Sequence, residues 1–381
     1  MTILNSVNNQ ALETSSSPAF AQTTLSALNP SITYTGTFKT PLQFTMYKSA
    51  LYQNAMFTNN ILSASIDMGS AFSDSTLLTL NLGGIQQITN AFNQTFTVMT
   101  SLVASSLISL PISLAITAPL LTTLTMGSLA YVNALTMSAA TLTTFSLPGL
   151  LGVAGSFAPT LALATTVSAP ALLNVLSGFA PVIASCTTLT MTNLLTVGAS
   201  FNGGTYTALT TVSFPALTTI GINIAQAWPA ATTFSMPNLV TIGNNLSPNL
   251  AVCTTLTLTS LATIGANVAA TLPSLVSWSL PAIVSIVGTF TISTPTALTT
   301  FSFGSTLTNI GGNVTITGAA LNQASVDGIL VSLAALDGTG GTTSYNSHTV
   351  NLSGGTSSTP SATGIAAAAT LTGRGCTVTT N

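Results

Sequence analysis

A repeat of about 22 residues constrains the fold of this chain more than any other feature. Residues 232–243 read TTFSMPNLVTIG, residues 210–221 read TTVSFPALTTIG and residues 254–265 read TTLTLTSLATIG. A fixed period of this length is typical of proteins that stack one structural unit on the next. The first apolar residue of each turn recurs every 21 to 23 residues, at Leu80, Leu102, Leu124, Phe145, Val167, Leu189, Val212, Phe234, Leu256, Trp278 and Phe301.

The apolar positions inside one turn predict a short strand followed by a return path. In the first turn they are Leu80, Leu82, Ile85 and Ile88, which gives the pattern L-x-L-x-x-L-x-x-I. The first pair has the two-residue period of a strand, so each turn contributes one strand to a parallel sheet. Turns that bury their apolar side only against their neighbours form a solenoid. We therefore predict a mainly β, right-handed β-solenoid of about eleven turns.

The extent of the repeat also predicts the domain boundaries. The polar N-terminus is expected to be an arm, and the mixture of aromatic and charged residues that follows it is expected to cap the first turn. The predicted domains are an extended N-terminal arm at 1–32, an N-terminal cap at 33–75, the solenoid at 76–318 and a small α/β C-terminal cap at 319–381.

The C-terminal cap contains the only strong helical patterns in the chain. Residues 321–336 have helical spacing, with Asn322 as a suitable N-cap. A second, shorter helix is expected at 361–371. Strands are expected at 349–353 and 376–380, and together these elements should close the last edge of the sheet.

The near-absence of charge is the main anomaly in composition. The chain has 3 Lys and Arg and 5 Asp and Glu, or 2% of its residues, whereas soluble domains have about 25%. Residues 75–326 contain no Asp, Glu, Lys, Arg or His. General acid-base catalysis and most metal sites need those side chains, and nucleic-acid binding needs basic ones. We therefore predict no enzymatic activity, no cofactor, no metal and no nucleic-acid partner.

The charged residues near the C-terminus are the only ones that could assemble a polar site. They are Asp327, Asp337, His348 and Arg374. They belong to no recognisable catalytic motif and lie in the predicted cap, so we expect them to have structural roles.

Neither a membrane span nor a classical signal peptide is predicted. The apolar stretch 98–121 contains Pro111 and Pro119 and has no flanking Lys or Arg. The first residues lack both the basic region and the apolar core of a secretory signal. A neutral surface suits a protein that is packed in an assembly. We therefore expect an extracellular or virion-surface location, reached by another route such as virion assembly followed by lysis.

The repeat resembles a known family. Residues 253–265 begin CTTLTL and end in IG, and residues 186–198 begin CTTLTM and end in VG. These strings are similar to the bacterial surface-antigen (BspA-like) type of leucine-rich repeat, as is a proline that follows the strand in several turns. The resemblance implies a leucine-rich-repeat fold and a role in adhesion or recognition. The missing charges and signal peptide depart from that family, so a surface-antigen role is not carried over.

The C-terminal segment carries a second resemblance. The string VNLSGGT and the ending GRGCTVTTN are similar to closing segments of phage tail proteins and bacterial surface proteins. This resemblance implies a place in a fibre or on a surface.

Two columns of small residues are expected to support the stack. Glycine recurs one residue after the Ile or Val of several turns and is expected to permit a corner. Asparagine recurs three residues after the Ile, where stacked amides can hydrogen-bond along the axis. The asparagines are Asn223, Asn245, Asn267 and Asn313. Cys186 and Cys253 share a column three turns apart, too far for a disulfide, and are interpreted as buried fillers.

Nine turns place two hydroxyl residues on the side of the strand that faces away from the core. This predicted contact face is open to three interpretations: β-branched residues that suit an exposed strand, a surface that packs against another copy, or an ice-binding ladder. It consists of Thr123, Thr125, Thr144, Ser146, Thr166, Ser168, Thr188, Thr190, Thr211, Ser213, Thr233, Ser235, Thr255, Thr257, Ser277, Ser279, Thr300 and Ser302.

Aromatic residues offer a weaker alternative, a sugar-binding patch. Tyr131, Tyr206, Trp228 and Tyr345 fall in loop or return positions and are expected to be exposed, whereas Trp278 occupies a core position of its strand.

The predicted function is that of a non-catalytic, self-associating structural subunit of an extracellular fibre or virion appendage. One alternative is a phage tail fibre or adhesin that recognises a host cell surface, and another is an ice-binding protein. The expected partners are copies of the chain itself, with a host surface as a further candidate.

Overall fold

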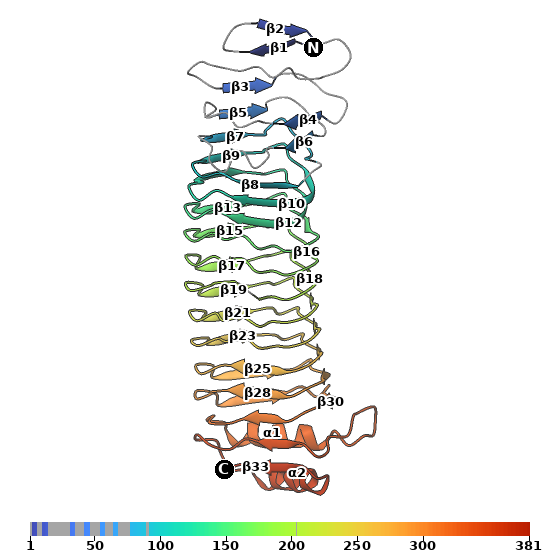
Figure 1. Ribbon diagram of the computed structural model, residues 1–381. Helices are drawn as coiled ribbons and strands as arrows, with labels where there is room; N and C mark the ends of the chain where they lie inside the picture. The colour runs from blue at the N-terminus through green and yellow to red at the C-terminus, as the bar shows by residue number, and fades with distance from the viewer. Residues whose placement is uncertain are drawn as a thin grey trace. The chain divides into compact units, whose positions relative to one another are not determined.

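Short strands form almost all of the regular structure, because each turn has room for only a few extended residues before the chain bends back. The computed structural model is a mainly β solenoid of about eleven turns (Figure 1). It describes strand segments at residues 2–5, 10–13, 31–34, 42–45, 54–57 and 64–67, and the chain at residues 77–88, 91–202 and 204–381. The predicted arm and N-terminal cap otherwise lie outside the described residues.

The chain divides into two compact units. Unit 1 comprises Met1–Leu172 with Pro181–Ile183, and unit 2 comprises Leu173–Ala180 with Ala184–Asn381.

Unit 1 contains one antiparallel hairpin and four groups of parallel strands. The hairpin is β1 (Thr2–Asn5) and β2 (Gln10–Glu13). The parallel groups are β3 (Ser31–Tyr34), β5 (Asn54–Phe57), β7 (Thr79–Asn81), β9 (Ser101–Val103) and β11 (Thr123–Thr125); β13 (Thr144–Ser146) and β15 (Thr166–Ser168); β4 (Leu42–Thr45) and β6 (Ala64–Asp67); and β8 (Phe92–Thr95), β10 (Ser109–Thr117), β12 (Tyr131–Ser138) and β14 (Gly152–Val153).

Unit 2 contains four groups of parallel strands. They are β17 (Thr188–Thr190), β19 (Thr211–Ser213), β21 (Thr233–Ser235) and β23 (Thr255–Thr257); β26 (Ser277–Leu280) and β29 (Thr300–Phe303); β16 (Asn174–Val175), β18 (Thr196–Val197), β20 (Thr219–Ile220), β22 (Thr241–Ile242), β24 (Thr263–Ile264), β27 (Ser285–Ile286) and β30 (Asn309–Ile310); and β25 (Val268–Thr271), β28 (Phe290–Ser293), β31 (Val314–Ile316), β32 (Thr349–Asn351) and β33 (Thr377–Thr379).

The parallel ladder of unit 1 begins before residue 76, where the sequence placed the start of the solenoid. Ser31 pairs with Asn54, and Asn54 pairs with Thr79, so β3 and β5 precede β7 in one sheet. The charged and aromatic residues in this region obscure the repeat in the sequence, although its backbone follows the same ladder.

The predicted core positions are buried. Leu80, Leu82, Ile85 and Ile88 have no exposed surface, and neither do the corresponding residues of later turns such as Phe234. Among the first apolar residues of the turns, Leu124 and Leu256 remain half-buried while the others are buried. Each turn therefore encloses its own apolar layer and covers the layers next to it.

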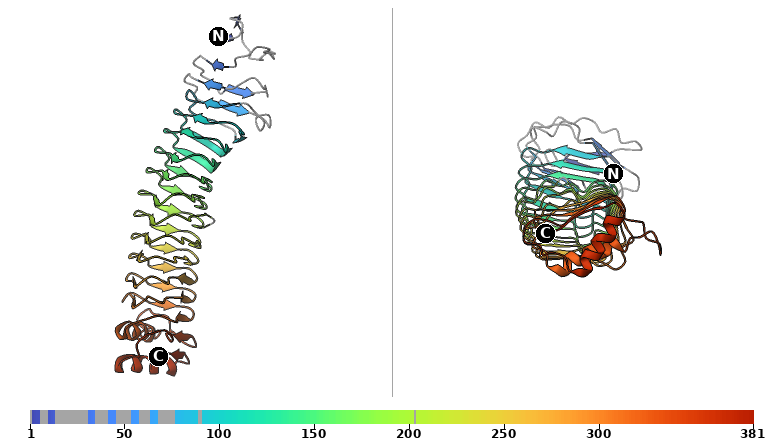
Figure 2. Two further views of the ribbon diagram at one scale, coloured as in Figure 1. Left: turned by 90° about the vertical axis from the view of Figure 1, so that its left-hand side faces the viewer. Right: turned by 90° about the horizontal axis from the view of Figure 1, so that it is seen from below.

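The C-terminal segment contains two helices and two strands close to the predicted bounds. Helix α1 (Gln323–Ala334) begins at Asn322, whose side chain accepts a hydrogen bond from the Ser325 amide. Helix α2 (Ala362–Gly373) packs beside α1 (Figure 2). Strands β32 and β33 follow the respective helices and continue the parallel sheet of β31.

The tail covers one sheet edge and extends another. Helix α1 occupies the place of the strand that would follow β29, because the Phe301 amide donates to the Ser325 hydroxyl at 3.1 Å and the Asn322 amide donates to the Thr299 carbonyl at 2.8 Å. In the neighbouring sheet, β33 is the last strand in the order and pairs only with β32. The prediction that the tail closes the last edge therefore holds for the β29 sheet but not for the β31 sheet.

A column of glycines sets how closely the turns of unit 2 approach each other. Gly221, Gly243 and Gly265 each donate their amide to a carbonyl one turn earlier, at 2.8–2.9 Å. A Cβ placed on Gly243 would overlap the carbonyl oxygen of Gly221, and one on Gly265 would overlap that of Gly243. None of these glycines has a positive φ. Glycine is required here by the close approach of the turns, not by the special corner geometry that the sequence suggested.

Replacing Gly243 with alanine is expected to destabilise the protein by about 1–3 kcal/mol, since two adjacent turns must separate to admit one methyl group. Gly127→Ala is the matched control, because a Cβ at Gly127 meets no atom within 4 Å. The control should change stability by less than about 0.5 kcal/mol. The free energy of unfolding, measured by urea denaturation, tests this; equal effects of the two substitutions would contradict it.

Candidate functional site

The predicted contact face consists of hydroxyl residues that lie in register on neighbouring strands. In unit 2, Thr188 pairs with Thr211, Thr211 with Thr233, and Thr233 with Thr255, and the second residues of the same strands pair in the same way. In unit 1, Thr144 pairs with Thr166. The strands β17, β19, β21 and β23 therefore bring eight predicted residues into two straight rows.

The face is less regular than the sequence suggested. The strands that carry it belong to separate groups of five, two, four and two within the described chain, so its pairing is not continuous. Exposure also varies along the rows. In β17 and β23 the first residues, Thr188 and Thr255, are exposed and the second residues are half-buried, whereas in β19 and β21 both residues are half-buried. The rows therefore form an uneven surface.

The hydroxyl groups of the contact face have no partners inside the protein. None of its eighteen side chains donates or accepts a hydrogen bond within the described residues. A hydroxyl group is both a donor and an acceptor, so each of them can bind water or a second surface. The face offers many weak, neutral and directional contacts and no charged one.

A further hydroxyl column, which the sequence reasoning missed, borders this face. The first threonine of most turns donates its hydroxyl to the carbonyl of the corresponding residue one turn earlier. The pairs include Thr122 with Thr100 at 3.2 Å and Thr210 with Thr187 at 3.1 Å. The Thr-Thr doublet that opens these turns was the available signal. Its first threonine joins turns together, and only its second belongs to the open face.

The asparagine column forms a hydrogen-bonded ladder in unit 2. The Asn245 side-chain amide donates to Asn223 Oδ1 at 3.1 Å, and that of Asn267 donates to Asn245 Oδ1 at 3.2 Å. The ladder ends on hydroxyls, Ser200 at one end and Thr289 at the other. Asn313 is not joined to the others; its Oδ1 accepts from the Thr349 amide at 2.8 Å. Most of this polar column serves stacking and offers little to a ligand.

Asn245→Ala is expected to destabilise the protein by about 1–3 kcal/mol, because it leaves the Asn267 amides and Asn223 Oδ1 without their partner. Asn249→Ala provides the control in the same turn. Asn249 is exposed and its side chain forms no hydrogen bond within the described residues. Urea denaturation should separate the two variants, and a loss for Asn249→Ala as large as that for Asn245→Ala would argue against the ladder.

Three of the four aromatic residues expected on the surface are in the core. Tyr206, Trp228 and Tyr345 have 0–1% of their surface exposed, whereas Tyr131 is 56% exposed. Tyr206 stacks on Trp228 with ring centroids 5.9 Å apart, and burial raises the pKa of the Tyr206 hydroxyl. The return path of a turn carries no periodic signal, so its inward residues cannot be recognised from spacing. Trp278 is buried, as predicted.

The charged residues of the C-terminal cap hold local structure. Asp327 accepts hydrogen bonds from the amide and hydroxyl of Ser361, the N-cap of α2. Arg374 donates to the Ala334 and Leu336 carbonyls at 2.8 and 2.9 Å, which satisfies the C-terminal end of α1. These contacts tie the helices together and leave neither side chain aimed at an open cavity.

Asp337 and His348 also lie apart from any catalytic arrangement. The Thr339 hydroxyl and amide donate to the Asp337 carboxylate and lower the pKa of Asp337, with a smaller effect from Arg374. The His348 ring contacts the buried Tyr345 ring at 4.9 Å. No group of three or more His, Cys, Asp or Glu that could hold a metal occurs in the described part of the chain. Cys186, Cys253 and Cys376 are buried thiols.

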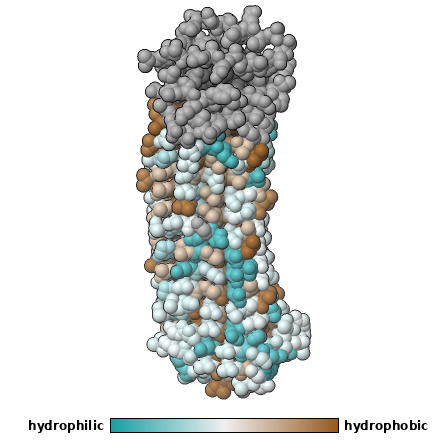
Figure 3. All heavy atoms as spheres, viewed as in Figure 1, coloured by the Kyte–Doolittle hydropathy of each residue, from teal (hydrophilic) through white to brown (hydrophobic). Residues whose placement is uncertain are grey.

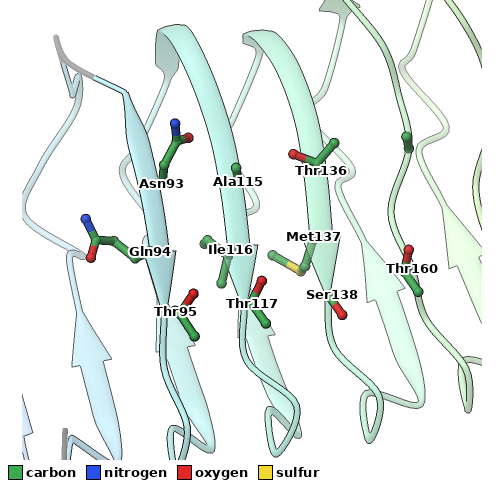
Figure 4. Close-up of a pocket in the computed structure, with 11 residues that line it drawn as sticks. Asn93, Gln94, Thr95, Ala115, Ile116, Thr117, Thr136, Met137, Ser138 and Thr160 are labelled. Carbon is green, nitrogen blue, oxygen red and sulfur yellow. The ribbon is translucent and has the colours of Figure 1, made fainter. Parts of the chain in front are cut away.

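A shallow groove lies across β8, β10 and β12 of unit 1 (Figure 4). Residues paired across these strands line it in rows, including Thr95, Thr117 and Ser138. Next to it, the Ser113 hydroxyl donates to Asn93 Oδ1 at 2.8 Å. The lining contains hydroxyl, amide and methyl groups and no charged group, so it supplies no acid, base or nucleophile activated by a neighbour.

Comparison with known protein families, curated proteins and solved structures finds no match to this chain. The resemblance to BspA-like repeats therefore stays a prediction. In the described residues, no helix is long and apolar enough to cross a membrane.

Proposed function

We propose that the protein is a non-catalytic structural subunit that associates with copies of itself through the contact face. The observation that carries this proposal is a set of open hydroxyls, in register on successive turns, with no charged residue among them. A flat neutral surface has little electrostatic repulsion to oppose the approach of an identical surface.

The character of the remaining surface supports the same proposal. On the side drawn in Figure 3, most of unit 2 is pale or hydrophilic, and hydrophobic residues occur in separate places. The hydrophilic character comes from hydroxyl and amide groups, because residues 75–326 contain no charge. With a formal net charge of only −2, long-range repulsion between copies is small.

The finer assignments belong to this proposal as well. We assign the turns to the leucine-rich-repeat type on their sequence pattern, and the subunit to an extracellular fibre or virion appendage on its neutral composition. Receptor recognition on a host surface is a less supported use of the same solenoid. The uneven rows of the contact face favour contact with a protein surface over the flat ice lattice.

The contact face can be tested by adding charge to it. Thr188→Lys, Thr211→Lys and Thr233→Lys together place three positive charges on successive turns, and like charges facing each other across an interface oppose association. At low salt, the dissociation constant should rise at least tenfold relative to the unmodified chain. About 1 M salt should restore much of the association, because it shortens the screening length to about 3 Å. Light scattering and electron microscopy measure the assemblies.

A matched variant separates the position of the charge from its amount. Ala225→Lys, Asn249→Lys and Ala269→Lys add the same charge on three successive turns at exposed sites outside the contact face. This control should assemble as the unmodified chain does. Monomers of the unmodified chain at every concentration would overturn the proposal, and equal effects of both triple variants would remove the contact face from it.

A further inference from the structure

The repeat is locally broken in unit 1, at strands β10 and β12. These strands have 9 and 8 residues, whereas the strands of most turns have two to four. The pairing of Leu110 with Val132 is followed by that of Ser113 with Ala134, so Pro111 and Ile112 lie opposite the single residue Asn133. Such a bulge points its extra residues out of the ladder, and bulges occur often beside functional sites.

The bulge lies beside a cluster of exposed apolar side chains. Ile108, Ile112 and Tyr131 have 46%, 44% and 56% of their surface exposed, and Pro111 between them is also exposed. The Tyr131 amide donates to the Ile108 carbonyl at 3.2 Å, which places these residues on adjacent turns. We call Ile108, Pro111, Ile112 and Tyr131 the Tyr131 patch. An exposed cluster of this kind indicates an interaction surface.

The Tyr131 side chain is held in place by the next turn. A Cβ on Gly152 would lie 3.4 Å from Tyr131 Cδ1, so the ring lies against a residue without a side chain. Neither the Tyr131 hydroxyl nor the exposed Asn133 amide group has a hydrogen-bond partner within the described residues. A rigid aromatic ring with neighbouring open polar groups is typical of the residues that dominate protein interfaces.

The chemistry of the patch and its surroundings selects the partner. The patch is aliphatic and aromatic, and its surroundings on β8, β10 and β12 are hydroxyl and amide groups. A charged partner would lose hydration on this surface and find no opposite charge there. A second copy of the patch is apolar and neutral and brings its own phenol and amide groups, so it matches this surface in charge and in hydrogen bonding.

Resting on the proposed self-association, we infer that the Tyr131 patch is a second self-contact, in which the patches of two copies pack against each other. It lies on the β10 and β12 strands, which are separate from the strands of the contact face. A subunit with one self-complementary face stops at a dimer, whereas two such faces allow growth beyond the dimer. The patch therefore determines whether association continues.

Four forms of the full chain test this inference by light scattering and analytical ultracentrifugation. The unmodified chain should form species larger than dimers. Ile112→Ser with Tyr131→Ser should stop at dimers joined by the contact face. The three-lysine variant of the contact face should stop at dimers joined by the patch at low salt. The combination of all five substitutions should be monomeric.

The outcomes separate this inference from the proposed function. Leu120→Ser with Leu163→Ser removes two exposed leucines from outside the patch and should assemble as the unmodified chain does. If the patch variant also forms species larger than dimers, the inference fails and the contact face stands. If the unmodified chain forms only dimers that the lysines disrupt, the second contact is again excluded. Circular dichroism verifies that each variant keeps its fold.

Discussion

Close stacking of the backbone from turn to turn is the constraint on which the rest of the structure depends. The amides of Gly221, Gly243 and Gly265 reach carbonyls one turn earlier, at a separation that no side chain at these positions would allow. Fixing the distance between turns in this way also fixes the register of every other column. The asparagine ladder, the first threonines and the apolar layers all meet their counterparts because the turns have one spacing.

The same constraint explains which features the sequence could predict. The period, the core positions around Leu80 and Phe234 and the tail helices follow from apolar spacing, and the structure agrees with them. Spacing says nothing about a return path, so Tyr206 and Trp228 were expected outside although they lie within the core. The depth of each hydroxyl residue depends on how the backbone bends locally, which also has no periodic signal.

The local irregularities were the hardest features to foresee. Pro111 and Ile112 read as part of an apolar run, and only the pairing on either side shows that they leave the ladder. The roles of the two threonines in each doublet differ for a similar reason. One hydroxyl reaches a carbonyl of the preceding turn, and the other points away from it. A one-residue step along a strand reverses the direction of the side chain, so identical residues serve separate purposes.

The regular stacking has an evolutionary consequence. Removing residues 232–253, one whole turn, would join Ala231 directly to Thr254, with the doublet, glycine and asparagine columns still aligned. Each turn contacts only its neighbours, so stability in such an array is nearly a sum over turns and interfaces. Duplication or loss of a 22-residue segment is therefore a small genetic step that changes length and preserves the fold. A lineage can thus adjust the reach of the molecule without redesigning its core.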